Sequence, residues 1–332
     1  MFKLSKKIAI CASGLILGGT ALLLAACGGT KTPEEPQKTA FTVAFTQNGA
    51  VKTEVTVSGG EKVNPSSVPA PEKESESLLT EWNFDFDAPV TQNLTVTAVS
   101  YTSGLVFKKS LSGGDYVVKG YSGTAAEVIM PDNYKGGAVT SVYASAFENN
   151  AAITSVRFPK NLTSIGDKAF KGCRNLTDVD IPETVTKLGA NVFSECTSFT
   201  KIVFPSKLTE IPSRAVQACS FYGLITVPEG VKTIGAYAFA CEATSILLPK
   251  SLRTIEELGL WYNLEEIYYA GDEADWETVA VSEKEYTGTG GITFSAKSIT
   301  TDKATLYFYS ETGIKNPEYN YWHYVSGVPV PW

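Results

Sequence analysis

Four cysteines recur at one interval and are the residues of this chain best suited to chemistry. Cys173, Cys196, Cys219 and Cys241 are spaced 23, 23 and 22 residues apart. A zinc site is disfavoured, because such sites favour close Cys-x-x-Cys pairs and no histidine lies nearby. Disulfides are disfavoured as well, because side chains at one repeat position run parallel and fit the disulfide dihedral angle poorly. Since cysteine is among the most buried residue types, we predict four free thiols in the core.

His323 is the only histidine, which excludes Ser-His-Asp and Cys-His catalytic centres and multi-histidine metal sites. Two carboxylates would suffice for a glycosidase. No such pair stands out, because Asp85 and Asp87 simply flank Phe86 and the other acidic pairs look like solvated turns. The sequence also has no glycine-rich phosphate loop followed by Lys and Ser or Thr. We therefore expect a protein that is not an enzyme and that holds no metal or cofactor.

The N-terminus has the pattern of a secretion signal. Three lysines within residues 1–7 precede an apolar run over residues 8–26, which ends in Leu-Ala-Ala before Cys27. This ending resembles the lipobox of bacterial lipoproteins, whose cysteine is acylated before the signal is removed. An uncleaved transmembrane anchor is the alternative, but small residues stand where a cleavage site should be. We predict lipidation of Cys27 and a location at the cell surface, anchored by lipid to the outer face of the bacterial membrane.

From residue 41 the sequence alternates between apolar and polar residues, which predicts short strands. Asn48-Gly49 marks a turn between two of them, and Trp82 precedes the last strand. This order resembles the internalin B-type β-grasp repeat over residues 41–100, although that family usually has glycine where this chain has Glu81. We expect Trp82 to be a core residue of this small module rather than a platform for a sugar.

A repeat of about 23 residues dominates the rest of the sequence. Three parallel series of residues keep this interval, apart from a longer first step among the prolines and a shorter last step in all three. They are Pro131, Pro159, Pro182, Pro205, Pro228 and Pro249; Val142, Ile165, Leu188, Ile211, Ile234 and Ile255; and Phe147, Phe170, Phe193, Val216, Phe239 and Leu260. A single unit cannot cover its own apolar side, so stacked units must share one continuous core. The pattern therefore predicts a solenoid of short strands and turns.

The motif Ser164-Ile165-Gly166-x-x-Ala169-Phe170-x-x-Cys173-x-x-Leu176 closely resembles the BspA-type leucine-rich repeat of bacterial surface proteins. The resemblance extends over about residues 112–332. It implies an α/β-type leucine-rich-repeat solenoid that is mostly β, with short turns and helical segments. In one repeat Pro212 replaces the usual glycine and Val216 the usual phenylalanine, so we expect local bends in the second half.

These patterns divide the chain into six segments. They are a signal peptide over residues 1–26, a flexible tether over 27–40, the β-grasp repeat over 41–100, a linker over 101–115, the repeat solenoid over 116–272, and an aromatic C-terminal cap over 273–332.

The residues between the core positions of each repeat strand should point outward, because side chains alternate along a strand. Stacking should bring them to one face, a surface that repeat proteins commonly use for extended partners. The predicted ligand face consists of Ser155, Arg157, Asp178, Asp180, Lys201, Val203, Leu224 and Thr226. It has no single charge sign, which favours a protein or peptide partner over a polyanion. An inert solvated face is the alternative.

The resemblance implies a surface protein for binding or adhesion, with host proteins, matrix proteins or other bacteria as partners. One alternative is capture of glycans or nutrients on the aromatic residues of 261–332, and another is a structural envelope component without a soluble ligand. The formal net charge of −7 argues against a nucleic-acid partner. A monomer is expected.

Overall fold

The computed structural model describes residues 38–332, apart from residues 112, 222 and 289–292. The predicted signal peptide, the lipid site Cys27 and most of the tether lie outside the described residues. Residues Ala40–Trp332 form one compact unit. In the part of the chain that is described, no helix is both long and apolar enough to cross a bilayer.

The first module is a four-stranded mixed sheet. Its strands, β1 (Ala40–Gln47), β2 (Ala50–Ser58), β3 (Leu78–Trp82) and β4 (Leu94–Thr102), lie in the order β2-β1-β4-β3. Strands β1 and β2 form a hairpin through Asn48 and Gly49, both with positive φ, as a tight hairpin turn requires. Strand β4 is parallel to β1 and antiparallel to β3, and the short helix η1 (Pro65–Ser67) lies in the connection between β2 and β3.

Trp82 is a core residue of this module, as predicted. Its side chain is 7% exposed, its ring packs on Phe45 with centroids 5.3 Å apart, and its indole N–H donates to the Pro69 carbonyl at 2.7 Å. The ring lies in a core that also contains Phe45 and Phe84, and the donated hydrogen bond satisfies its polar end.

The segment that we expected to be a linker contains a strand. Strand β5 (Leu105–Lys109) pairs antiparallel with β6 (Tyr116–Tyr121), which in turn lies parallel to β9 (Gly137–Val142). The rings of Tyr101, Phe107 and Tyr134 pack together behind this hairpin. Residues 101–115 therefore contribute a strand and a buried ring to the first coils of the repeat, and the strand pairing was not visible in the sequence.

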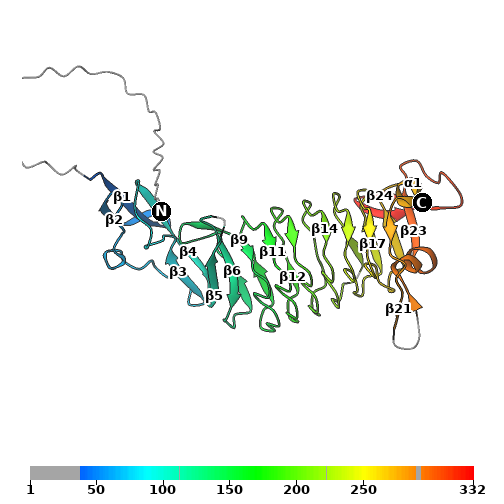
Figure 1. Ribbon diagram of the computed structural model, residues 1–332, viewed down its shortest axis with the longest axis horizontal. Helices are drawn as coiled ribbons and strands as arrows, with labels where there is room; N and C mark the ends of the chain where they lie inside the picture. Colours follow the sequence, from blue (N-terminus) through cyan, green and yellow to red (C-terminus); the bar gives the residue numbers. More distant parts are fainter. Residues whose placement is uncertain (1–37, 112, 222, 289–292) are drawn as a thin grey trace, which may run out of the picture. The chain divides into compact units, whose positions relative to one another are not determined.

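The predicted solenoid is confirmed. The repeats contribute short strands to two rows, and within each row, apart from one interruption described below, a strand pairs in parallel with its counterpart one repeat away (Figure 1). The first row contains β7 (Glu127–Ile129), β10 (Ser155–Arg157) and β12 (Asp178–Val179), then β15 (Leu224–Thr226), β17 (Ser245–Leu248) and β19 (Glu266–Tyr269). The second row contains β9, β11 (Ser164–Ile165) and β13 (Lys187–Leu188), then β14 (Glu210–Ile211), β16 (Thr233–Ile234), β18 (Thr254–Ile255) and β20 (Ala280–Val281), with β8 (Asn133–Tyr134) beside β9.

The core between the rows consists of ladders of equivalent side chains. The Phe147 and Phe170 rings stack with centroids 4.9 Å apart, and Phe170 and Phe193 follow at 5.6 Å. Beside them, the backbones of successive repeats approach very closely. A Cβ atom at Gly189 would lie 2.2 Å from the Asp167 nitrogen of the preceding repeat, so only glycine fits there.

Both rows are interrupted at one repeat. Strands β12 and β15 belong to different sheets, as do β13 and β14. Where the ladder is intact, Gly189 N–H donates to the Ile165 carbonyl and Gly235 N–H to the Ile211 carbonyl, each at 2.8 Å. The residue at the equivalent position is Pro212, which has no N–H and cannot donate to Leu188. The departure noted in the sequence at Pro212 therefore marks a break in the hydrogen-bonded ladder.

The small side chain of Val216 is compensated within the core. Phe204 packs its ring edge-to-face against Phe239, with centroids 6.1 Å apart. Because Phe239 has Val216, and no phenylalanine, as its counterpart in the preceding repeat, Phe204 supplies the neighbouring ring instead. The apolar core thus continues past the repeat at which the two strand rows are interrupted.

The C-terminal residues extend the first row. Strands β23 (Thr305–Tyr309) and β24 (Asn320–Val325) continue it in parallel from β19, and β25 (Val328–Pro331) closes it as an antiparallel hairpin. The remaining elements here are α1 (Glu273–Glu277), β21 (Tyr286–Thr287), β22 (Thr293–Phe294), α2 (Ala296–Ser298) and η2 (Ile299–Lys303). The edge strand contains Pro329 and Pro331, which cannot donate to a further strand.

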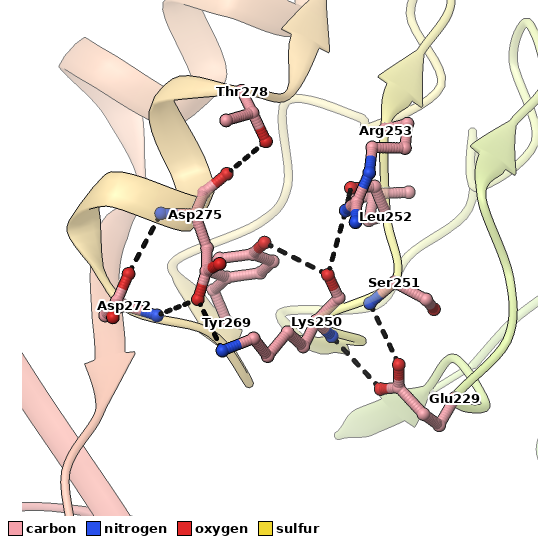
Figure 2. A network of polar contacts seen from close by, with 9 residues as sticks. All are labelled: Glu229, Lys250, Ser251, Leu252, Arg253, Tyr269, Asp272, Asp275 and Thr278. Carbon is pink, nitrogen blue, oxygen red and sulfur yellow. Dashed lines mark hydrogen bonds and ion pairs between the residues drawn. The ribbon is translucent and has the colours of Figure 1, made fainter.

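Lys250 links helix α1 to the last repeats (Figure 2). Its ammonium lies 2.8 Å from Asp275, and this hydrogen bond lowers the pKa of that carboxyl. The Glu229 carboxylate accepts hydrogen bonds from the backbone N–H groups of Lys250 and Ser251, at 3.1 and 2.9 Å. Glu229 follows Pro228, and the corresponding Glu183 after Pro182 accepts from the Ser206 N–H at 2.9 Å. The turns after Pro205 and Pro249 are therefore capped by a glutamate of the preceding repeat.

Candidate functional site

The outward residues of the first row lie as the alternation predicts, with the buried residue between them. In β10, Val156 is buried while Arg157 is exposed, and in β15, Ile225 is buried between the exposed Leu224 and Thr226. Among the described side chains of the predicted ligand face, Ser155 is half-buried and the other six are exposed; they are Arg157, Asp180, Lys201, Val203, Leu224 and Thr226. For Asp178, only the backbone is described, and it pairs with Ser155 across β10 and β12.

The break in the ladder divides this face into two parts. Arg157 and Asp180 line a groove of about 490 Å³ between successive repeats, together with Lys160 and Glu183. Lys201, Val203, Leu224 and Thr226 line a second cavity of about 320 Å³, while Ser155 lines neither. The structure thus brings the predicted residues together in two groups.

We call the second cavity the notch. Its walls are two strand segments of successive repeats, residues 200–204 and 224–226, and its remaining lining residues are Phe221 and Pro228. Val203 is 59% exposed and Leu224 is 39% exposed, so two apolar side chains stand in water at its rim. The phenyl rings of Phe204 and Phe221 are buried beneath it.

The outward face changes character after β15, which the sequence analysis missed. In the next strands the outward positions are Leu247 and Tyr268, and both side chains are buried in a small cluster with Trp322. Burial, then the hydrogen bond to Glu266, raises the pKa of Tyr268 well above its usual value. Leu247 and Tyr268 keep the two-residue alternation, but Trp322 joins them only because β24 enters the same sheet. The accessible part of the face therefore ends near β15.

The four repeat cysteines are buried and unpaired, as predicted. The thiols of Cys173, Cys196 and Cys219 donate to carbonyl groups in the preceding repeat, at 3.1 Å each. Burial raises the pKa of Cys173 and of Cys241 to about 12, so neither forms a thiolate near neutral pH. The ladder of thiols therefore packs the core and has no nucleophilic character.

The other residues considered for chemistry are held in structural contacts. His323 stacks on Trp332 with ring centroids 3.8 Å apart. Asp85 lies 3.6 Å from Lys109 and Asp87 lies 3.9 Å from Lys62. Over residues 38–332, excluding the undescribed positions, no group of three or more His, Cys, Asp or Glu side chains could hold a metal ion.

Comparison with known proteins identifies the repeats. Residues 140–265 match the BspA type leucine rich repeat region in six copies. No match was found among curated proteins.

Similar solved structures include three bacterial leucine-rich-repeat proteins. A protein from T. pallidum is 26% identical, with 49% of this chain and 78% of that chain covered and a TM-score of 0.44. One from Bacteroides ovatus is 25% identical, with 51% and 54% covered and a TM-score of 0.44. A leucine rich cell surface protein from Faecalibacterium prausnitzii is 24% identical, with 58% and 57% covered and a TM-score of 0.45. This chain therefore spans little more than half the length of the last two.

We predict that a maleimide will not label the four repeat cysteines of the native protein between pH 7 and pH 9. Their raised pKa keeps them protonated over that range, and burial blocks access. Peptide mass mapping should show all four labelled after denaturation, with no mass change on reduction. Thr197→Cys provides the control, because Thr197 is exposed beside the buried Cys196 and its replacement should label readily. Equal labelling of Cys196 and the introduced thiol would contradict the prediction.

Proposed function

We propose that this chain is a lipid-anchored protein of the bacterial cell surface that binds another protein through the outward face of its repeats. One observation carries the proposal: residues from three successive repeats, Arg157, Asp180 and Lys201, are exposed on one face above a fully packed core. Solenoids use such surfaces because adjacent repeats supply contacts in register.

The rigidity of the repeats supports this proposal. In β10 and β15 the face residues flank the core residues Val156 and Ile225, whose burial fixes the backbone before any partner arrives. A preorganised surface loses little conformational entropy on binding, so more of the contact energy appears as affinity. The alternation of Arg157, Asp180 and Lys201 suits a partner of mixed charge, since a polyanion would meet Asp180.

The first module has the strand order that supports the internalin B-type β-grasp assignment. Its support is the mixed sheet ordered β2-β1-β4-β3, in which β1 and β4 are parallel and Asn48-Gly49 forms the turn of the first hairpin. In the proposed protein this module stands between the membrane tether and the repeats.

Capture of a glycan is the second candidate function. Trp261 packs against Tyr262, Tyr286 and Phe294, and the two tyrosine rings are 47% and 40% exposed. Exposed aromatic faces can stack on sugars. A glycan array with the variant Tyr262→Ala separates this site from the repeat face.

We predict that wild-type protein incorporates labelled palmitate in its bacterial host and that Cys27→Ala does not. The variant should accumulate as an unprocessed precursor without acyl chains, because acylation of the cysteine precedes removal of the signal. Cys11→Ala is the matched control, because Cys11 lies within the apolar run of the proposed signal and should not change labelling. A wild-type protein without label would refute the lipid anchor.

We further predict that replacing Arg157, Asp180 and Lys201 together by alanine weakens binding to a partner identified by pull-down by at least about tenfold. Folding stability should change by less than ~0.5 kcal/mol per site, because all three side chains are exposed. The control replaces Lys187, Glu210 and Lys232, three exposed charges on the second row, and should bind as wild type does. Surface plasmon resonance gives both affinities.

Two results would count against the repeat face. If the face variant binds as tightly as wild type while deletion of residues 41–100 abolishes binding, the first module holds the site. If the face variant and the second-row variant weaken binding equally, net charge alone explains the effect.

A further inference from the structure

The notch is a place where two neighbouring strand segments have lost their hydrogen bonds to each other. Thr200 N–H still donates to the Thr177 carbonyl of the preceding repeat at 3.3 Å. Beyond it, within the described residues, no backbone hydrogen bond joins residues 200–204 to residues 223–227. Elsewhere in the same two repeats the backbones remain bonded, as between Arg214 N–H and the Ala236 carbonyl at 2.9 Å. The opening is therefore local to the predicted ligand face.

Unpaired strand backbone is a binding feature in its own right. An extended segment presents N–H and C=O groups in a fixed register, and another extended chain can pair with them by β-augmentation. Residues Lys201–Val203 offer such groups at the rim of the notch, because they belong to no sheet. Their partner must supply donors and acceptors with strand spacing, which an extended peptide does and a sugar or an ion does not.

The side chains of the notch favour an apolar residue in the bound chain. Val203 and Leu224 are exposed on opposite walls, and the half-buried Ile202 lies between them and the core. An aliphatic side chain placed between these walls would remove all three from water, at roughly 25 cal/mol per Å² of apolar surface. Both aromatic rings of the lining are buried, so no exposed ring is present for stacking on a sugar.

The charge of the notch favours an acidic partner. Lys201 is exposed and is the only charged residue among those that line it. It makes no ion pair with another described residue. A carboxylate next to the apolar residue of the bound chain would complement it.

We propose that the notch binds an extended acidic peptide segment of a partner protein, in which an aliphatic side chain enters between Val203 and Leu224 and a neighbouring carboxylate pairs with Lys201. The peptide backbone pairs with residues Lys201–Val203 as an added strand. This inference rests on the proposed function, because it names the segment that the repeat face recognises.

The test uses the full chain in a mild detergent and capped peptides of about nine residues, a usual strand length. In the first peptide Val and Glu alternate, in the second Val and Lys alternate, and the third is the first with every backbone amide methylated. Fluorescence anisotropy should show the first peptide binding at least about tenfold more tightly than the other two.

Two variants with matched controls assign the binding to the notch. Val203→Asp should weaken binding of the Val-Glu peptide by at least about tenfold, and Lys201→Glu should reverse the preference between the Glu and Lys peptides. Thr209→Asp and Lys207→Glu place the same changes at exposed positions of the same repeat that do not line the notch. Both controls should bind as wild type does.

Three results would overturn the inference. If no peptide binds wild type, the notch does not recognise extended chains. The proposed function is then still tested separately, by the surface plasmon resonance measurement of partner binding to the variant at Arg157, Asp180 and Lys201. If Lys207→Glu weakens binding as much as Lys201→Glu, long-range charge explains the affinity. If wild type sediments as a dimer and Val203→Asp as a monomer, the occupant is a second copy of this chain.

Discussion

Hydrogen bonding between successive repeats is the interaction on which the rest of the structure depends. Apart from β9, each strand in the repeats is only two to four residues long, so none is stable unless the backbones of neighbouring repeats supply its partners. This closeness explains why Gly189 cannot carry a side chain, since a Cβ atom would meet the Asp167 backbone. It also aligns the Phe147, Phe170 and Phe193 rings and the cysteines into ladders, because equivalent atoms must repeat at the spacing of the backbones.

Pro212 shows what happens when one donor is removed from that system. The chain keeps its core at this point, where Phe204 reaches Phe239, but both strand rows change sheet. The notch on the face that we propose for binding lies between this repeat and the next, with residues 200–204 and 224–226 as its walls. Natural sequences often depart from local structural rules at functional sites. Here the departure from the repeat pattern occurs in the repeat that also carries the exposed Val203, opposite the exposed Leu224.

The periodicity of apolar residues was sufficient to predict the solenoid and its core, because the same positions are apolar and buried in successive repeats. Ile165 and Phe170 are examples of such positions. The periodicity also predicted which strand residues face outward. The unpaired state of Lys201–Val203 could not be predicted from periodicity, since Ile202 and Phe204 keep the apolar positions of the repeat. The cluster around Trp322 was missed because it depends on pairing between segments distant in sequence, which no local pattern records.

Native-state hydrogen exchange tests most directly the claim that the ladder opens at the proposed binding face. The account predicts that the amides of Lys201, Ile202 and Val203 exchange at least about 100-fold faster than those of Val156 and Val179. Val156 and Val179 occupy, in the paired strands β10 and β12, the position that Ile202 occupies in its own repeat. Residues 189 and 235, whose amides donate between repeats, should be among the well-protected positions. Protection of Lys201–Val203 equal to that of β10 would show that the ladder is continuous, and would contradict both the interruption and the notch.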